Sequence, residues 1–138
     1  METRKENYGS QLRILRRGES LRSRQYRGVC VSVIHEWDSI EILRTEMDPG
    51  STVEDREIGN FPLIHLVIEG SPLFLVADQP GDLIPGDSVS LRADEKYRIS
   101  NPASSRSIIL TILLKKSEEQ SSEPHKAAFQ ATSPVRRP

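Results

Sequence analysis

Two stretches of the chain decide its fold: Gly50-x5-Arg56-x-Ile58-x4-Leu63-x6-Gly70 and Gly86-x5-Arg92-x-Asp94-x2-Tyr97-x3-Asn101. Each opens at a turn, because Asp48-Pro49-Gly50 and Pro85-Gly86-Asp87 combine a proline that presets its own φ with a glycine that accepts positive φ. Residues 63–68 are apolar and β-prone except for His65. The two stretches therefore predict short strands joined by tight turns.

The same strand pattern continues on both sides of these stretches. Val29, Val31 and Val33 alternate with their neighbours, which is the two-residue period of a strand with one buried face. Further strands are predicted at 40–46, 73–76, 89–91, 97–99 and 108–114, with a break at 78–81. No segment of the body repeats apolar residues every 3.6 positions. About eight strands in all predict an all-β fold, either a jelly roll or a small barrel.

Length and composition divide the chain into one domain and two ends. A chain of 138 residues with 36% apolar content builds one modest core. Residues 118–138 hold mostly Ser, Glu, Gln, Ala and Pro, too little apolar surface to offset the entropy lost on ordering. We predict a flexible basic N-terminal arm at 1–24, a β-barrel domain at 25–117 and a disordered tail at 118–138.

Charge is segregated along the chain. Residues 1–27 carry eight Lys or Arg against three Asp or Glu, whereas residues 28–116 carry eight against fourteen. The basic end is either a solvated arm, a strand that crosses a neighbouring subunit, or a contact for the phosphates of an anionic ligand or nucleic acid. The arginines concerned are Arg13, Arg16, Arg17, Arg22, Arg24 and Arg27. No aromatic residues are interleaved for base stacking, so we do not expect a nucleic-acid partner.

Cysteine usage and hydropathy bear on the compartment. The single cysteine, Cys30, cannot form an internal disulfide, which favours a reducing environment. No run approaches the roughly 18 apolar residues of a membrane span, and the first thirty residues lack the apolar run of a signal peptide. We expect a cytoplasmic protein without a membrane partner.

The two opening stretches resemble the paired motifs of the cupin family. Asp48-Pro49-Gly50 resembles the turn that opens the first motif, residues 66–70 resemble its closing strand and turn, and residues 85–89 are similar to the Gly-Asp turn of the second. Asn101 follows Tyr97 at the family's distance. The resemblance covers about residues 40–114 and implies a jelly-roll β-barrel that holds a metal between three histidines and a glutamate.

The residues at the four implied ligand positions are not ligands. With the longer permitted spacing these positions hold Arg56, Ile58, Leu63 and Tyr97. The shorter spacing places Glu57 and Gly59 at the first pair, which supplies one oxygen donor and no histidine. Arginine stays protonated and repels a cation, while Ile and Leu donate nothing. We therefore predict a metal-free protein without a cofactor.

The remaining polar groups suggest a ligand site in the barrel mouth. We expect ligand-binding residues among Arg56, His65, Tyr97, Arg92, Arg98 and Glu57, because arginine forks and a tyrosine hydroxyl suit a small anionic or polyhydroxylated ligand. In the alternative interpretation, Arg56 and Arg92 are surface residues paired with nearby carboxylates, and His65 is a structural histidine. The face of the sheet that His65 occupies stays open at this stage. His35 is expected at a strand end, and His125 lies in the tail.

The sequence leaves three functions open. The first is a protein without redox catalysis that binds a small ligand or a protein partner, and we favour this non-enzymatic interpretation. The second, suggested by metal-independent relatives of the family, is an isomerase or epimerase with His65 and Tyr97 as base and acid. The third is an accessory homodimer, which the resemblance implies, formed through the strands at 108–114 and 29–34.

Overall fold

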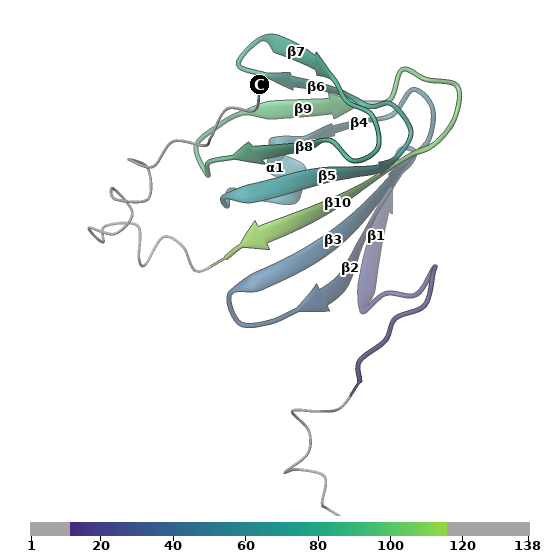
Figure 1. The fold of residues 1–138 in the computed structure, drawn as a ribbon, viewed down its shortest axis with the longest axis vertical. Coiled ribbons are helices and arrows are strands. Elements are labelled where there is room, and N and C mark those ends of the chain that lie inside the picture. The colour runs from purple at the N-terminus through teal and green to yellow at the C-terminus, as the bar shows by residue number, and fades with distance from the viewer. Residues whose placement is uncertain (1–11, 116–138) are drawn as a thin grey trace, which may run out of the picture.

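The computed structural model describes residues 12–115, which form two antiparallel sheets wrapped into a barrel (Figure 1). The six-stranded sheet has the order β1-β2-β3-β10-β5-β8 and the four-stranded sheet the order β4-β9-β6-β7. The six-stranded sheet contains β1 (Arg22–Tyr26), β2 (Val29–Glu36), β3 (Ile40–Met47), β10 (Ser107–Leu114), β5 (Leu63–Glu69) and β8 (Ser88–Leu91). The four-stranded sheet contains β4 (Thr52–Glu54), β9 (Tyr97–Ser100), β6 (Leu73–Val76) and β7 (Gln79–Asp82), and one short helix, α1 (Asp55–Ile58), follows β4.

The predicted all-β fold is confirmed, and its centre is β10. This strand pairs with β3 on one side and β5 on the other, and its side chains alternate strictly between buried and part-exposed. Inward side chains of both sheets meet in one core. Its buried apolar members are Val29, Val31, Leu43, Met47, Val53, Leu63, Val67, Phe74, Leu91, Tyr97, Ile99, Ile109 and Leu113.

Asn101 explains why the two motif stretches keep their spacing. Its buried side-chain amide donates to the carbonyl oxygens of Met47 and Ser105, both at 2.9 Å. The backbone N–H of Gly50 donates to the carbonyl of Asn101 at 2.7 Å, and the N–H of Asn101 donates to Ser51 at 3.0 Å. The end of the second motif therefore fastens the opening turn of the first.

Gly70 closes the first motif because no side chain fits there. It has φ of +91°, and a Cβ at this position would lie 2.7 Å from the Cα of Ser107 on the neighbouring strand. Any substitution would force β5 and β10 apart at the corner of the barrel.

Ten strands, rather than about eight, are present in residues 12–115, together with one helix that the sequence did not suggest. The predicted break at 78–81 is wrong: β7 begins at Gln79, after a two-residue hairpin loop in which Ala77 and Asp78 have φ of 51° and 66°. Paired positive φ angles suit such a hairpin but usually call for Asn or Gly. Pro80 is tolerated because β7 is an edge strand.

The N-terminal boundary also differs from the prediction. β1 begins at Arg22, so the predicted border between arm and barrel after residue 24 falls inside a strand that pairs with β2. The tail predicted at 118–138 lies outside the described residues. Within the described part of the chain, no helix has the length and apolar character needed to span a bilayer.

Candidate functional site

His65 lies in the barrel interior, which answers the question of its face. It points inward from β5 with Leu63 and Val67 and is 1% exposed. Its Nδ1 lies 2.8 Å from the Oγ1 of Thr111 on the adjacent strand β10. The imidazole packs against Phe74, with ring centroids 5.3 Å apart. The Thr111 hydroxyl therefore fixes the orientation of the ring.

Tyr97, the other residue that the sequence suggests as an acid or base, lies beside His65. The two rings meet edge to face with centroids 5.0 Å apart, and Tyr97 is 5% exposed. Three buried side-chain atoms have no hydrogen-bond partner among residues 12–115: the Nε2 of His65, the hydroxyl of Tyr97 and the Oγ1 of Thr45. Such atoms are uncommon in a well-packed interior.

Burial keeps both groups of the pair uncharged. Desolvation lowers the pKa of His65 to about 3, so the imidazole is neutral at neutral pH. Burial, followed by the charge of Asp55 and the phenol of Tyr26, raises the pKa of Tyr97 well above its ordinary value. A base this weak and an acid this weak are poorly matched to proton transfer near pH 7. Neither residue lines the cavities of about 270, 390 and 460 Å³ that open among residues 12–115.

The donor set of the barrel interior does not fit a metal ion. Leu63 and Tyr97 occupy two of the implied ligand positions inside the core, Ile58 packs against the core, and Arg56 is exposed. Residues 12–115 contain no group of three or more His, Cys, Asp or Glu side chains arranged to hold a metal. His65 alone offers a nitrogen donor at this place, and a site needs at least three convergent ligands.

The three arginines predicted at the site lie on the surface. Arg56 pairs with Glu54 at 3.3 Å with a side chain that is 79% exposed, and Arg98 pairs with the same glutamate at 3.4 Å. Arg92, 69% exposed, pairs with Asp94 at 3.6 Å. This geometry matches the alternative interpretation of paired surface residues for Arg56 and Arg92. A ligand-binding role for the three stays a prediction.

Among the predicted site residues, Glu57 lines a cavity. A cavity of about 270 Å³ opens between the inner face of β1–β3 and helix α1, and we call it the barrel-mouth cavity. Its floor is apolar and its rim is charged. The floor consists of Val31, Val33, Leu43 and Ile58, and the rim of Arg22, Arg24, Glu41 and Glu57.

Hydrogen bonds across the mouth set the positions of the rim residues. The Arg24 Nη2 donates to the backbone carbonyl of Glu57 at 2.8 Å, and its guanidinium lies 5.6 Å from the centre of the Tyr26 ring. The Tyr26 hydroxyl donates to the Glu57 carboxylate at 3.3 Å, and the same carboxylate accepts from the Glu54 N–H at 2.9 Å. These bonds connect β1 to α1 across the opening.

The other half of the rim is a charge cluster. Arg22 donates to both Glu36 and Glu41, at 2.9 and 2.8 Å. Its hydrogen bond is the main reason that the pKa of Glu36 falls to about 2. Glu41 therefore faces the cavity with part of its hydrogen-bonding capacity already in use.

The sequence prediction missed Arg22, Arg24 and Glu41 as cavity residues. A signal was present, because Arg22, Arg24 and Tyr26 alternate and so share one face of a strand. The sequence alone places Arg22 and Arg24 in a flexible arm, because only the backbone pairing with β2 shows that they belong to the barrel.

Comparison with known proteins identifies the architecture. No protein-family model matches the sequence, and no curated protein matches it. Solved structures do match. The plu4264 protein from Photorhabdus luminescens superposes with a TM-score of 0.64 at 15% identity, over 86% of this chain and 99% of that one. A Cupin 2 conserved barrel domain protein from Salinispora arenicola superposes with a TM-score of 0.62 at 15% identity, over 78% and 90% of the two chains.

This protein has the cupin fold. A third match is a sugar phosphate isomerase of the cupin superfamily from Silicibacter pomeroyi, with a TM-score of 0.56 at 12% identity, covering 68% of this chain and 69% of that one. Identities this low show a shared fold and leave function to the residues of the cupin barrel itself.

Proposed function

We propose that this cupin barrel binds a small polyhydroxylated ligand in the barrel-mouth cavity and performs no redox chemistry. The observation that carries the proposal is the pairing of charged donors and acceptors on the rim with an apolar floor in one cavity of about 270 Å³. Ligand sites commonly combine an apolar lining with a few convergent polar groups.

The rim chemistry favours hydroxyl groups over a purely anionic ligand. Arginine carries five N–H donors, and Arg24 directs one nitrogen to the Glu57 carbonyl. Glu41 and Glu57 offer carboxylate oxygens that accept from hydroxyls and repel a bare anion. The aliphatic floor suits the C–H face of a sugar or cyclic polyol. That a protein of the same fold is named a sugar phosphate isomerase supports this ligand class.

Ligand-observed NMR with the full chain tests the proposal. The panel contains hexoses, pentoses, inositol, sugar phosphates and simple dicarboxylates. We expect saturation transfer from the protein to at least one polyol or sugar, and a loss of at least tenfold in affinity for Arg24→Met and for Glu57→Gln.

Two surface variants test the alternative location of the site in the same experiment. Arg92→Gln and Arg98→Gln remove arginines that lie outside the barrel-mouth cavity. If these variants weaken binding while Arg24→Met does not, the ligand binds at the surface arginines that the sequence predicted and not in the barrel-mouth cavity. Absence of transfer to every sugar and polyol contradicts the proposed ligand class.

The outer face of the six-stranded sheet favours a second function, that of a homodimeric accessory protein. Every outward position of β10 and of residues 64–68 of β5 is Ile or Leu, and β3 adds two more. The nine outward aliphatic residues, here called the aliphatic outer face, are Ile40, Ile42, Ile64, Leu66, Ile68, Ile108, Leu110, Ile112 and Leu114. The predicted contribution of β2 differs, because Val29 and Val31 point into the core.

A second copy of this chain is the occupant that fits this face best. At about 33 Å² of flat sheet per outward side chain, nine residues form roughly 300 Å², which suits the apolar centre of an interface of about 800 Å² per partner. The border supplies Arg44 beside Glu46, which lie 3.1 Å apart, and a twofold axis can place each against its opposite in the copy. Light scattering of the full chain at several concentrations tests the dimer, and a strict monomer removes it.

A further inference from the structure

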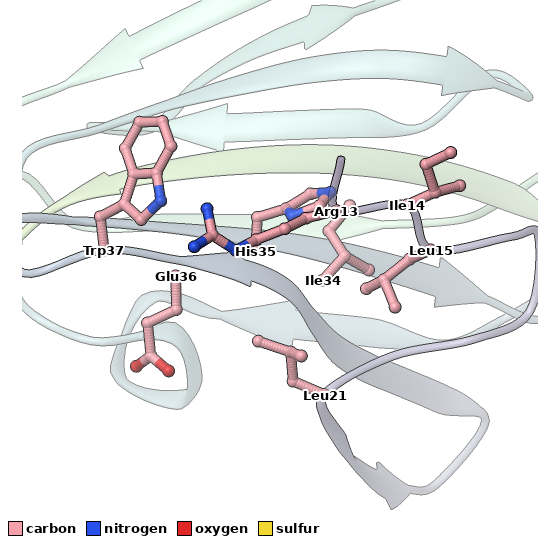
Figure 2. A pocket seen from close by; sticks show the side chains of 8 residues that line it. All are labelled: Arg13, Ile14, Leu15, Leu21, Ile34, His35, Glu36 and Trp37. Carbon is pink, nitrogen blue, oxygen red and sulfur yellow. The ribbon is translucent and has the colours of Figure 1, made fainter. Parts of the chain in front are cut away.

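Another hollow lies between residues 12–21 and the end of β2 (Figure 2). It measures about 390 Å³, which falls in the size range of small-molecule sites. Its apolar walls come from Ile14, Leu15, Leu21, Ile34 and Trp37, its charged members are Arg13 and Glu36, and His35 adds an imidazole. None of these residues lines the barrel-mouth cavity. We call this hollow the Trp37 groove.

Large apolar side chains are concentrated here although solvent reaches them. Trp37 is 72% exposed, Leu21 53% and Ile14 51%. A single exposed apolar residue needs no explanation, but several around one hollow mark a binding surface. Trp37 also presents a flat ring, which gives large contact area at little entropic cost.

Backbone hydrogen bonds hold both walls of the groove in place. The Leu21 N–H donates to the Val33 carbonyl at 2.8 Å, and the Trp37 N–H donates to the Ile40 carbonyl at 2.7 Å. In the arm, the Glu19 N–H donates to the Arg16 carbonyl at 2.9 Å and the Glu19 carboxylate accepts from the Arg16 N–H at 2.7 Å. A bulge between Val33 and His35 turns the end of β2 toward the arm. The Leu21 and Trp37 walls of the hollow are therefore held in place by the backbone.

The free charge in the groove is positive. The Glu36 carboxylate is occupied by Arg22 at 2.9 Å and Lys115 at 3.6 Å, and it points away from the Arg13 guanidinium in Figure 2. Arg13 has no ion pair or hydrogen bond with any of residues 12–115. The groove thus offers a guanidinium fork that has no acceptor among residues 12–115, beside an exposed aromatic ring.

We propose that the Trp37 groove binds a small amphipathic anion, an aromatic or branched aliphatic carboxylate. The apolar body lies on Trp37 and Leu21 while the carboxylate accepts from Arg13 in a bidentate pair. Among the described residues of the groove, the guanidinium of Arg13 matches a carboxylate and the ring of Trp37 matches an apolar body. This site is independent of the ligand proposed for the barrel mouth.

The test uses Trp37 as its own reporter, because it is the only tryptophan of the chain. Phenylacetate is titrated into the full-length protein while Trp37 emission is recorded, and phenylacetamide serves as the uncharged probe of the same shape. We expect a saturable change with phenylacetate and at least tenfold weaker binding of phenylacetamide. Arg13→Gln removes this difference, whereas Arg17→Gln, an exposed arginine of the same segment outside the groove, changes affinity less than twofold.

Three outcomes overturn the proposal. Equal affinity for the charged and the uncharged probe shows that Arg13 does not select an anion. Unchanged phenylacetate binding in Arg13→Gln places the anion elsewhere. Emission that follows protein concentration instead of probe concentration, together with dimer formation that Trp37→Ala abolishes, assigns the groove to contacts between copies of this chain.

Discussion

The two faces of β5 and β10 reverse the usual order of a sheet with one solvated side. Their inward positions include three polar residues, His65, Ser107 and Thr111, whereas their outward positions through residue 68 hold only Ile and Leu. An antiparallel sheet that meets water on one face normally alternates apolar inside with polar outside. We therefore expect another protein surface to bury the outer face, and each inner polar group needs a hydrogen-bond partner.

The inner polar groups themselves fall into two kinds. Ser107 donates to the Asn101 side-chain oxygen at 3.2 Å, and Thr111 bonds the His65 ring at 2.8 Å. The remaining nitrogen of His65 and the hydroxyls of Tyr97 and Thr45 have no partner among the described residues. Two questions follow: whether a partner molecule covers the outer aliphatic side chains, and how much each inner polar group with or without a hydrogen bond contributes to stability.

A charge on the aliphatic outer face has the largest expected effect. Ile112→Glu places a carboxylate at the centre of the proposed dimer contact, and burying an unpaired charge there weakens association at least a thousandfold, about 4 kcal/mol. Sedimentation equilibrium measures the dissociation constant. Thr52→Glu, on the exposed side of β4 in the four-stranded sheet, is the matched control and leaves the dimer intact. A wild-type chain that is already monomeric contradicts the prediction.

The pH dependence of stability tests the buried, uncharged state of His65 on the inner face. The folded pKa of His65 is about 3 against an ordinary 6.5, so the unfolded chain binds a proton in this range that the folded chain does not. Stability is complete above pH 6.5 and falls as pH drops, by roughly 2–3 kcal/mol between pH 6.5 and 4.5. Urea unfolding across this window measures the slope. His65→Gln keeps a polar side chain of similar size that does not titrate, so it should reduce the dependence of stability on pH. An equal pH dependence in this variant contradicts the assignment of the slope to His65.

Thr111→Val tests whether the satisfied hydroxyl matters. The change conserves shape and removes the partner of the His65 Nδ1, so we expect a loss of about 1–3 kcal/mol in the free energy of unfolding. Thr45→Val is the same substitution on neighbouring β3, at a hydroxyl that has no partner within residues 12–115, and should lose less than about 1 kcal/mol. Equal losses in the two variants would remove the distinction between the two hydroxyls.

Tyr97→Phe has the smallest expected effect. It deletes a buried hydroxyl that has no partner among residues 12–115, so stability stays equal or rises by up to about 1 kcal/mol. Thermal unfolding of both proteins measures the difference. A loss greater than 1 kcal/mol would show that the hydroxyl has a partner in solution and would restore interest in the His65–Tyr97 pair as an acid and base.

The sequence predicted the frame of the molecule better than its site. Gly50 and Gly70 could be predicted because turns and close approaches restrict residue type locally, and Asn101 because it keeps the spacing of the cupin motif. The positions of Arg56 and Arg98 could not, because an exposed arginine goes to whichever carboxylate the fold brings near, here Glu54 for both. The cavity rim was missed because membership of Arg24 in the barrel depends on pairing with Val31. The hairpin at Ala77 and Asp78 could not be predicted, because it lacks the glycine that such positive φ angles usually require.

The amide of Asn101 reaches across 54 residues of chain to the carbonyl of Met47. Met47 and Ser107 pair where β3 meets β10, so this corner joins segments that the chain alone would leave far apart. Loss of the Asn101 amide would leave the carbonyls of Met47 and Ser105 without this donor, and we expect it to speed the unfolding of the barrel.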